Sequence, residues 1–286
     1  MSAHFRIAAI TDEFSPDLEI AVQSMKSIGM TGAELRMVFG KNIIDLTDEE
    51  LDRAIGIVHS AGMEILSIAS PLLKCVLPDA PDVDERFQQD MFAAKLTFAD
   101  QPRLAARAFE IAKKTGAKII RVFSYWRTVN PEACFDRIVV ALRGLAEQAV
   151  AHGVIIGLEN EHACNIGSAA ETAKVLAALD HPNLKVVWDP ANAVVAGEKP
   201  IPEGFALLPL SRIQHVHAKD CIMEAHKPLW CELGKGVVGW PEQIDLLIRG
   251  GYTGWISLET HWPGPGGDKH EASMICGRKL SELVSV

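Results

Sequence analysis

Eight short apolar segments alternate with helix-like segments along almost the entire chain. The strand-like segments are residues 5–11, 32–36, 63–70, 117–124, 154–159, 184–189, 212–220 and 254–262. Strands that alternate with helical patterns indicate βαβ units around a parallel sheet. Because a closed (β/α)8 barrel takes about 250 residues, the 286-residue length predicts one α/β domain over residues 1–286, folded as a (β/α)8, or TIM, barrel.

The connecting segments carry signals of their own. The helix predicted from Thr47 begins with a capping box, because Glu50 follows three residues later, and it ends at Gly62. A doubly wound sheet is the alternative fold, but it usually has fewer strands and a glycine-rich first turn, and the first strand here is followed by ITDEFSP. Residues 71–102 are long for a loop, so we expect an extra helix there, over the barrel mouth, or an ordinary surface insertion.

Composition and charge exclude several classes of protein. The net charge is −9 and no Lys/Arg run exceeds two residues, so the basic patch of a nucleic-acid-binding protein is missing. The chain begins without signal-peptide features and has no apolar run of the roughly 20 residues that span a membrane. Six cysteines without a CxxC motif favour reduced thiols. These features predict a cytoplasmic protein that binds neither nucleic acid nor membrane, and they leave homo-oligomerisation open.

Four consecutive predicted strands end in residues that can bind a metal. They are Glu159, Asp189, His217 and Glu259. Active sites of (β/α)8 barrels lie at the C-terminal ends of the strands, so we expect these four side chains to meet. Three carboxylates in one place repel one another unless a cation lies between them. Oxygen ligands with one imidazole suit Mn²⁺, Mg²⁺ or Co²⁺, and Zn²⁺ also fits. The pattern therefore predicts one divalent metal ion.

The same stretches resemble a known superfamily. GLENEH at 157–162, VVWDPANA at 186–193, IQHVHAKD at 213–220 and residues 233–262 are similar to the xylose isomerase-like TIM barrels, which include sugar isomerases and epimerases, inosose and 3-dehydroshikimate dehydratases and apurinic endonucleases. The resemblance covers nearly the whole chain and is specific to the superfamily, not to one reaction. It implies that the four strand-end residues hold one metal and that the two glutamates exchange a substrate proton.

One position departs from the superfamily pattern. Many relatives have Asp-x-x-His after the sixth strand, whereas this chain has Asn192 at the place of that histidine. The change weakens the endonuclease interpretation, and so does the acidic net charge. It also puts in doubt a histidine role in substrate binding at this position.

Proton abstraction next to a carbonyl is the chemistry that this set of residues predicts. We expect a metal-dependent isomerase or epimerase of a ketose or related polyol ketone, with Glu159 and Glu259 as catalytic acids and bases. A dehydratase of the inosose or 3-dehydroshikimate type and a non-catalytic sugar-binding barrel are the alternatives. Residues near the strand ends that are expected to bind the substrate are Glu34, Arg36, Lys74, Arg127, Glu161, His162, Asn192, Lys219, Trp240 and His261.

Overall fold

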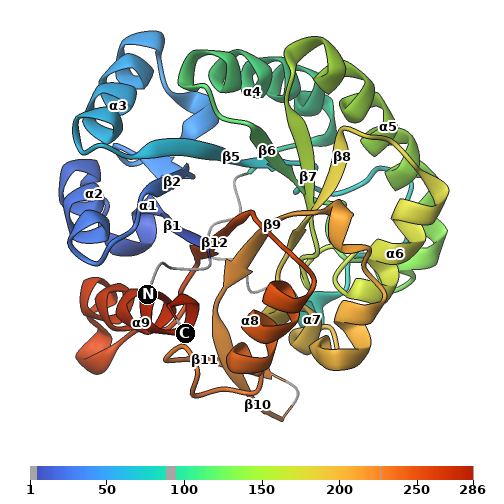
Figure 1. The fold of residues 1–286 in the computed structure, drawn as a ribbon. Coiled ribbons are helices and arrows are strands. Elements are labelled where there is room, and N and C mark those ends of the chain that lie inside the picture. The colour runs from blue at the N-terminus through green and yellow to red at the C-terminus, as the bar shows by residue number, and fades with distance from the viewer. Residues whose placement is uncertain (1–4, 88–94, 226, 286) are drawn as a thin grey trace.

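Eight parallel strands close into a barrel in the computed structural model, which describes residues 5–87, 95–225 and 227–285 (Figure 1). Around the ring their order is β1, β12, β9, β8, β7, β6, β5, β2. Their bounds are β1 Arg6–Ile10, β2 Gly32–Leu35, β5 Glu64–Leu72, β6 Ile119–Val122, β7 Ile155–Glu159, β8 Leu184–Trp188, β9 Ile213–Ala218 and β12 Trp255–Leu258. The predicted (β/α)8 fold is confirmed, and each predicted strand segment overlaps one of these strands; β5 extends two residues beyond the predicted segment 63–70.

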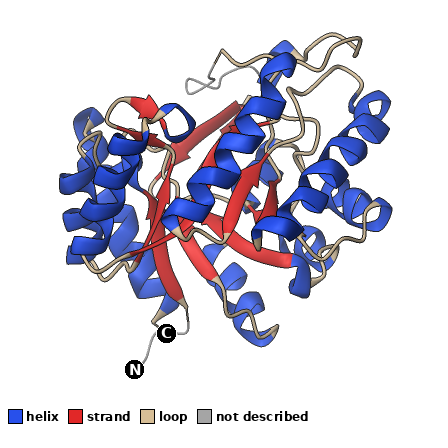
Figure 2. Ribbon diagram, turned by 90° about the horizontal axis from the view of Figure 1, so that it is seen from above, coloured by secondary structure: helices blue, strands red, loops and turns tan. Residues whose placement is uncertain are grey.

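Helices enclose the barrel on its outer side (Figure 2). The longer ones are α2 Leu18–Ser27, α3 Asp48–Ser60, α4 Gln101–Thr115, α5 Phe135–His152, α6 Ala169–Ala178, α8 Trp240–Arg249 and α9 Lys269–Val284. Two short ones, α1 Thr11–Phe14 and α7 Pro190–Val195, follow β1 and β8 directly. The predicted capping box at the start of α3 is confirmed, since Thr47 and Glu50 exchange side-chain-to-backbone hydrogen bonds. None of the helices in the described ranges is long and apolar enough to cross a membrane.

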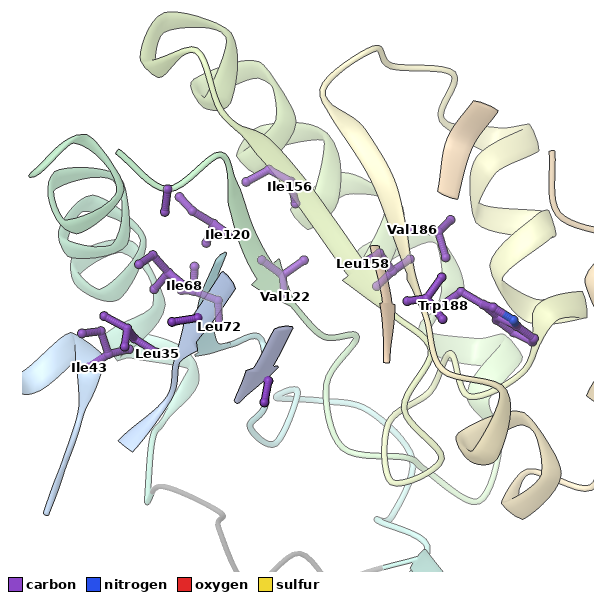
Figure 3. Packing of buried hydrophobic residues seen from close by; sticks show 14 of the residues in the cluster. Leu35, Ile43, Ile68, Leu72, Ile120, Val122, Ile156, Leu158, Val186 and Trp188 are labelled. Atoms are coloured by element: carbon purple, nitrogen blue, oxygen red, sulfur yellow. The ribbon is translucent and has the colours of Figure 1, made fainter. Parts of the chain in front are cut away.

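The strands pack their outward side chains against these helices. Ile120 and Val122 of β6 are fully buried in the apolar layer between sheet and helices, together with Ile156 and Leu158 of the neighbouring β7 (Figure 3). Successive side chains of a strand point to opposite faces. Arg121, between Ile120 and Val122, therefore points into the barrel, as does every second residue of each strand.

The long segment after β5 forms only short helical turns in its described part. These are Glu85–Phe87 and Phe98–Asp100, both 3-10 turns. The extra helix expected within residues 71–102 falls partly on residues 88–94, which lie outside the described residues. Further 3-10 turns are Ile43–Asp45, Pro131–Cys134, Leu210–Arg212 and Pro265–Gly267, and Pro200–Gly204 forms a π-helical turn.

Two antiparallel hairpins add to the barrel. The first pairs β3, Met37–Val38, with β4, Lys41–Asn42, and the second pairs β10, Asp220–Glu224, with β11, Lys227–Cys231, at the lower edge of Figure 1. Asp220 anchors the second hairpin, because its carboxylate accepts backbone N–H bonds from Cys221, Gly234, Gly236 and Val238 at 2.9–3.2 Å. A Cβ atom at Gly236 would collide with the Asp220 carboxylate, so this anchor requires glycine there.

Candidate metal centre and substrate cavity

The four strand-end residues come together as expected. One ligand atom from each of Glu159, Asp189, His217 and Glu259 lies within 4.8 Å of the other three. The side chains are buried, because each ends a strand of the closed barrel and points to its inside. Within the described ranges, Glu159 Oε2 and Asp189 Oδ2 accept no well-aligned hydrogen bond. Three carboxylates and an imidazole, with two such buried oxygens among them, are a donor set that fits a divalent cation.

His217 is held so that one ring nitrogen faces the carboxylates. Its Nδ1 lies 3.4 Å from Glu159 Oε1 and 3.4 Å from Glu259 Oε2. Its Nε2 lies 3.2 Å from Glu34 Oε1 on the opposite side. An imidazole that donates one N–H to a carboxylate and turns the other nitrogen to a metal is the usual arrangement of a ligating histidine. Nδ1 is therefore the nitrogen that could ligate.

Glu34 lies beneath the four residues, away from the cavity where we expected it to bind substrate. The same Oε1 atom that contacts His217 accepts a 2.8 Å hydrogen bond from His215 Nε2. Burial alone would raise the pKa of Glu34, but the two imidazoles hold it well below its usual range. Glu34 is not among the residues that line the cavity, and its carboxylate contacts the two histidines of β9 instead, so its role in substrate binding stays a prediction.

Three buried cations surround the carboxylates. Lys219 Nζ lies 2.9 Å from Asp189 Oδ2 and 3.0 Å from Glu259 Oε2. Arg36 Nη1 donates to Glu259 Oε1 at 3.1 Å, and Arg121 Nη1 lies 3.2 Å from Glu159 Oε2. The sequence analysis missed Arg121, although a charged residue inside the apolar run IIRVF was a signal. At an inward position of a barrel strand, such a residue has to meet a counter-charge.

These contacts shift the acidity of the centre. Burial would raise the pKa of Glu259, but Lys219, His217 and His261 hold it well below its usual range. Burial raises the pKa of Asp189 to about 6, against the lowering effect of Lys219. Burial lowers the pKa of His217, yet Glu34 and Glu159 together raise it well above its usual value. Lys219 thus acts on both carboxylates that it contacts, and Glu259 is held in its ionised form.

A cavity of about 650 Å³ opens above this centre. Glu259 lies on its wall, and so do five of the residues expected to bind substrate: Arg36, Lys74, Glu161, His162 and His261. Three aromatic side chains, Phe87, Phe123 and Trp230, also line it. Trp230 comes from the β10–β11 hairpin and packs edge-on against His261 with 4.9 Å between ring centroids. Carboxylates, cations and aromatic faces on one wall can bind the hydroxyl groups and the C–H face of a polyol.

A chain of contacts links the cavity wall to the centre. Lys74 Nζ lies 3.8 Å from Glu161 Oε2, and the Glu161 carboxylate lies 3.1 Å from His162 Nδ1. His162 Nδ1 also lies 2.8 Å from Asn192 Oδ1. Asn192 in turn donates to Glu159 Oε1 at 3.3 Å. The asparagine that departs from the superfamily pattern therefore bridges His162 to the predicted ligand Glu159.

The remaining expected substrate contacts lie outside the cavity wall. Arg127 points the other way and pairs with Glu171 at 2.9 Å. Trp240 is fully buried at the start of α8, and its Nε1 donates to the Lys219 carbonyl at 2.9 Å. Neither side chain is among those that line the cavity. Asn192 and Lys219 lie below the wall, in contact with the carboxylates.

Comparison with known proteins identifies relatives over nearly the full chain. The family model of the xylose isomerase-like TIM barrel matches residues 22–280. Inosose dehydratase 1 of a Bacillus cereus strain is 22% identical over 272 residues, which cover 88% of this chain and 86% of the relative. In the matches to inosose dehydratases of Bacillus cereus (strain AH820) and Mesomycoplasma hyopneumoniae (strain 7448), at 25% identity, the chain spans about half the relative's length, 49% and 46% respectively.

Solved structures share the fold at lower identity. The IolI protein with a bound zinc atom superposes with a TM-score of 0.76 at 16% identity over 98% of both chains. The probable 3-DHS dehydratase AsbF from Bacillus anthracis superposes with a TM-score of 0.71 at 20% identity, over 94% of this chain and 97% of that chain. The 3-keto-D-glucoside 4-epimerase YcjR from E. coli superposes with a TM-score of 0.67 at 14% identity, over 98% of this chain and 100% of that chain.

Proposed function

Because the chain belongs to the xylose isomerase-like TIM barrel family, we propose that it is a metal-dependent enzyme that isomerises or epimerises a sugar-like polyol ketone. The reaction begins with removal of a proton from the carbon next to the carbonyl. One observation carries the proposal: two carboxylates, Glu159 and Glu259, lie 3.4 Å from the same nitrogen of His217, below a cavity of about 650 Å³.

The metal would be held by Glu159, Asp189, His217 and Glu259. A divalent ion bound there acts as a Lewis acid on the substrate carbonyl and makes the neighbouring C–H acidic. Mn²⁺, Mg²⁺ and Co²⁺ suit the oxygen-rich set, and Zn²⁺ also fits. Two relatives of the same fold, described with a zinc atom and in complex with magnesium, support a metal without deciding which ion this chain uses.

The side chains of this site have distinct roles in the proposed reaction. Glu259 borders the cavity, so its carboxylate can reach a bound substrate and accept the proton. Glu159, on β7, is separated from the strand of Glu259 by β8 and β9, and it can return a proton to the other face of the same carbon or to its neighbour. Arg121 next to Glu159 and Arg36 next to Glu259 fix the two carboxylates in place. Burial of all four excludes bulk water from the reacting atoms.

Dehydration is the second candidate, and the matches to inosose dehydratases favour it. Both reactions share the first proton abstraction and differ in the second step. Elimination needs an acid beside the departing hydroxyl. His261 borders the cavity, with Nε2 at 3.8 Å from Glu259 Oε1, and could donate that proton.

Deuterium exchange separates the two outcomes. The Mn²⁺-loaded protein is incubated in deuterium oxide with ketoses, inososes and 3-keto-glycosides, and the products are analysed by NMR and mass spectrometry. Isomerisation or epimerisation places deuterium next to the carbonyl and leaves the mass otherwise unchanged. A product lighter by one water assigns a dehydratase. Binding of these compounds without any exchange would leave a sugar-binding barrel and overturn the enzymatic proposal.

A further inference from the structure

Lys219 occupies a central place among the proposed metal ligands. It follows β9 directly, two residues after His217, and is 2% exposed. Its ammonium lies 2.9 Å from Asp189 Oδ2 and 3.0 Å from Glu259 Oε2. A lysine buried in this way needs carboxylate partners, and here the partners are two residues that would ligate the ion.

The two oxygens that Lys219 contacts are the ones available for a metal. Asp189 Oδ1 already accepts the backbone N–H of Asn192 at 2.9 Å, and Glu259 Oε1 accepts from Arg36 at 3.1 Å. The other oxygens, Asp189 Oδ2 and Glu259 Oε2, face the centre, and Glu259 Oε2 lies 3.4 Å from His217 Nδ1. A divalent ion and the ammonium would therefore need the same pair of oxygens, and in a site shielded from solvent two neighbouring cations repel strongly.

We propose that Lys219 and the divalent ion occupy the Asp189–Glu259 carboxylate pair alternately, so that metal binding requires the ammonium to swing out toward the cavity. The inference rests on the proposed metal site and adds that the Lys219 ammonium competes with the ion for the two carboxylates. Without metal, Lys219 neutralises the buried carboxylates and preserves the site. With metal, its ammonium becomes part of the surface that meets the substrate.

The surroundings of Lys219 allow a movement of the side chain alone. The backbone stays fixed, because Trp240 Nε1 donates to the Lys219 carbonyl at 2.9 Å and the next residue, Asp220, is held by four amides. In the direction of the cavity, the ammonium lies 5.4 Å from the centroid of the Trp230 ring, whose face attracts a cation. The Glu161 carboxylate on the same wall attracts it as well.

Metal affinity of a charge-neutral variant tests the inference. Lys219→Met keeps an unbranched side chain that ends where the ammonium group would begin, and removes its charge. Calorimetric titration with Mn²⁺ alone should show binding at least tenfold tighter than in the unmodified protein. Lys219→Arg keeps the charge and should bind no tighter than the unmodified protein. Lys227→Met removes a lysine from the same cavity, away from the carboxylates, and should leave the affinity unchanged within about twofold.

Thermal melting gives a second readout that is independent of activity. In EDTA, Lys219→Met should melt at a lower temperature than the unmodified protein, and saturating Mn²⁺ should raise its melting temperature more. Equal Mn²⁺ affinity in the unmodified protein and in Lys219→Met would overturn the alternation and leave the metal site intact. If neither protein binds Mn²⁺, the proposed function is overturned as well. If Lys219→Met does not fold, Lys219→Gln is measured against the same two outcomes.

Discussion

The two ends of the barrel interior differ in chemistry more than in shape. At the N-terminal end, Ala8, Leu66 and Trp255 pack together, and a hollow of about 840 Å³ borders Leu66 and Trp255. At the C-terminal end, a smaller cavity of about 650 Å³ lies above the buried carboxylates, cations and imidazoles. The grouping of ionisable side chains, not the size of the hollow, distinguishes the C-terminal end.

Packing explains what the N-terminal end does. A Cβ atom at Gly32 would lie 2.6 Å from the Trp255 ring and 3.0 Å from Ala8 Cβ, so the strands approach closely there. Charged side chains at this end, such as Glu64, are exposed. The two ends of the barrel axis therefore differ in role. Apolar contacts close the N-terminal end, and buried charges that are paired with opposite charges form a candidate site at the C-terminal end.

Removing one carboxylate charge from the C-terminal end should have the largest effect. Glu259→Gln keeps the shape of the side chain but loses both the proposed base and a metal ligand. We expect kcat to fall by about a thousandfold, within the usual range for loss of a general base, while the circular dichroism spectrum stays that of a folded barrel. Turnover at the unmodified rate with saturating metal would remove Glu259 from the mechanism.

The pH dependence of metal binding probes the same end. Ligands must lose their protons before they bind a metal. Burial raises the pKa of Asp189 to about 6, and Glu34 and Glu159 raise that of His217 against the effect of its burial. Affinity for Mn²⁺ should therefore fall as pH falls, and more steeply below about pH 6, where two protons compete with the ion. A titration series across this range would show a flat profile if neither group ligates.

Glu34→Gln tests the contact beneath the ligands. The variant keeps an acceptor for His217 but loses the negative charge that orients and polarises the imidazole. Loss of such a carboxylate partner usually costs about 10–100-fold in metal affinity, and we expect that loss in a Mn²⁺ titration. Glu64→Gln is the matched control, since Glu64 is an exposed acid at the other end. An equal change in both variants would argue against an orienting role.

Leu66→Ala should have the smallest effect on activity and a clear effect on stability. Truncation of a buried leucine leaves a cavity and costs about 2–5 kcal/mol, measured as the free energy of unfolding in urea. Because Leu66 is remote from the carboxylates, kcat should stay within about twofold of the unmodified value. A large loss of kcat with unchanged stability would mean that the two ends are coupled.

The strand ends were predictable because a period-two apolar strand leaves few places for a charged residue. Glu159, Asp189 and Glu259 each end an apolar run, and the barrel brings such ends together. The meeting of these three with His217 follows from topology alone. Their roles, like the cytoplasmic location and the oligomeric state, stay predictions.

Other parts of the site depend on side-chain direction, which the sequence does not encode locally. Glu34 and Arg36 both point into the barrel, yet Glu34 meets two histidines and Arg36 meets Glu259. Arg127 follows its strand like the others and turns to Glu171. The helix α9 was also missed, because its sequence has only a weak amphipathic pattern between Lys269 and Val284.

The anchor at Asp220 lies where the barrel strand β9 leads into the β10–β11 hairpin. Asp220 and Gly236 fix both ends of the segment that carries β10 and β11, so His217 keeps its position whatever the hairpin between them contains. Trp230, on that hairpin, reaches the cavity. A library that varies the hairpin and keeps Asp220 and Gly236 should therefore change one wall of the cavity and leave the buried carboxylates beneath it in place.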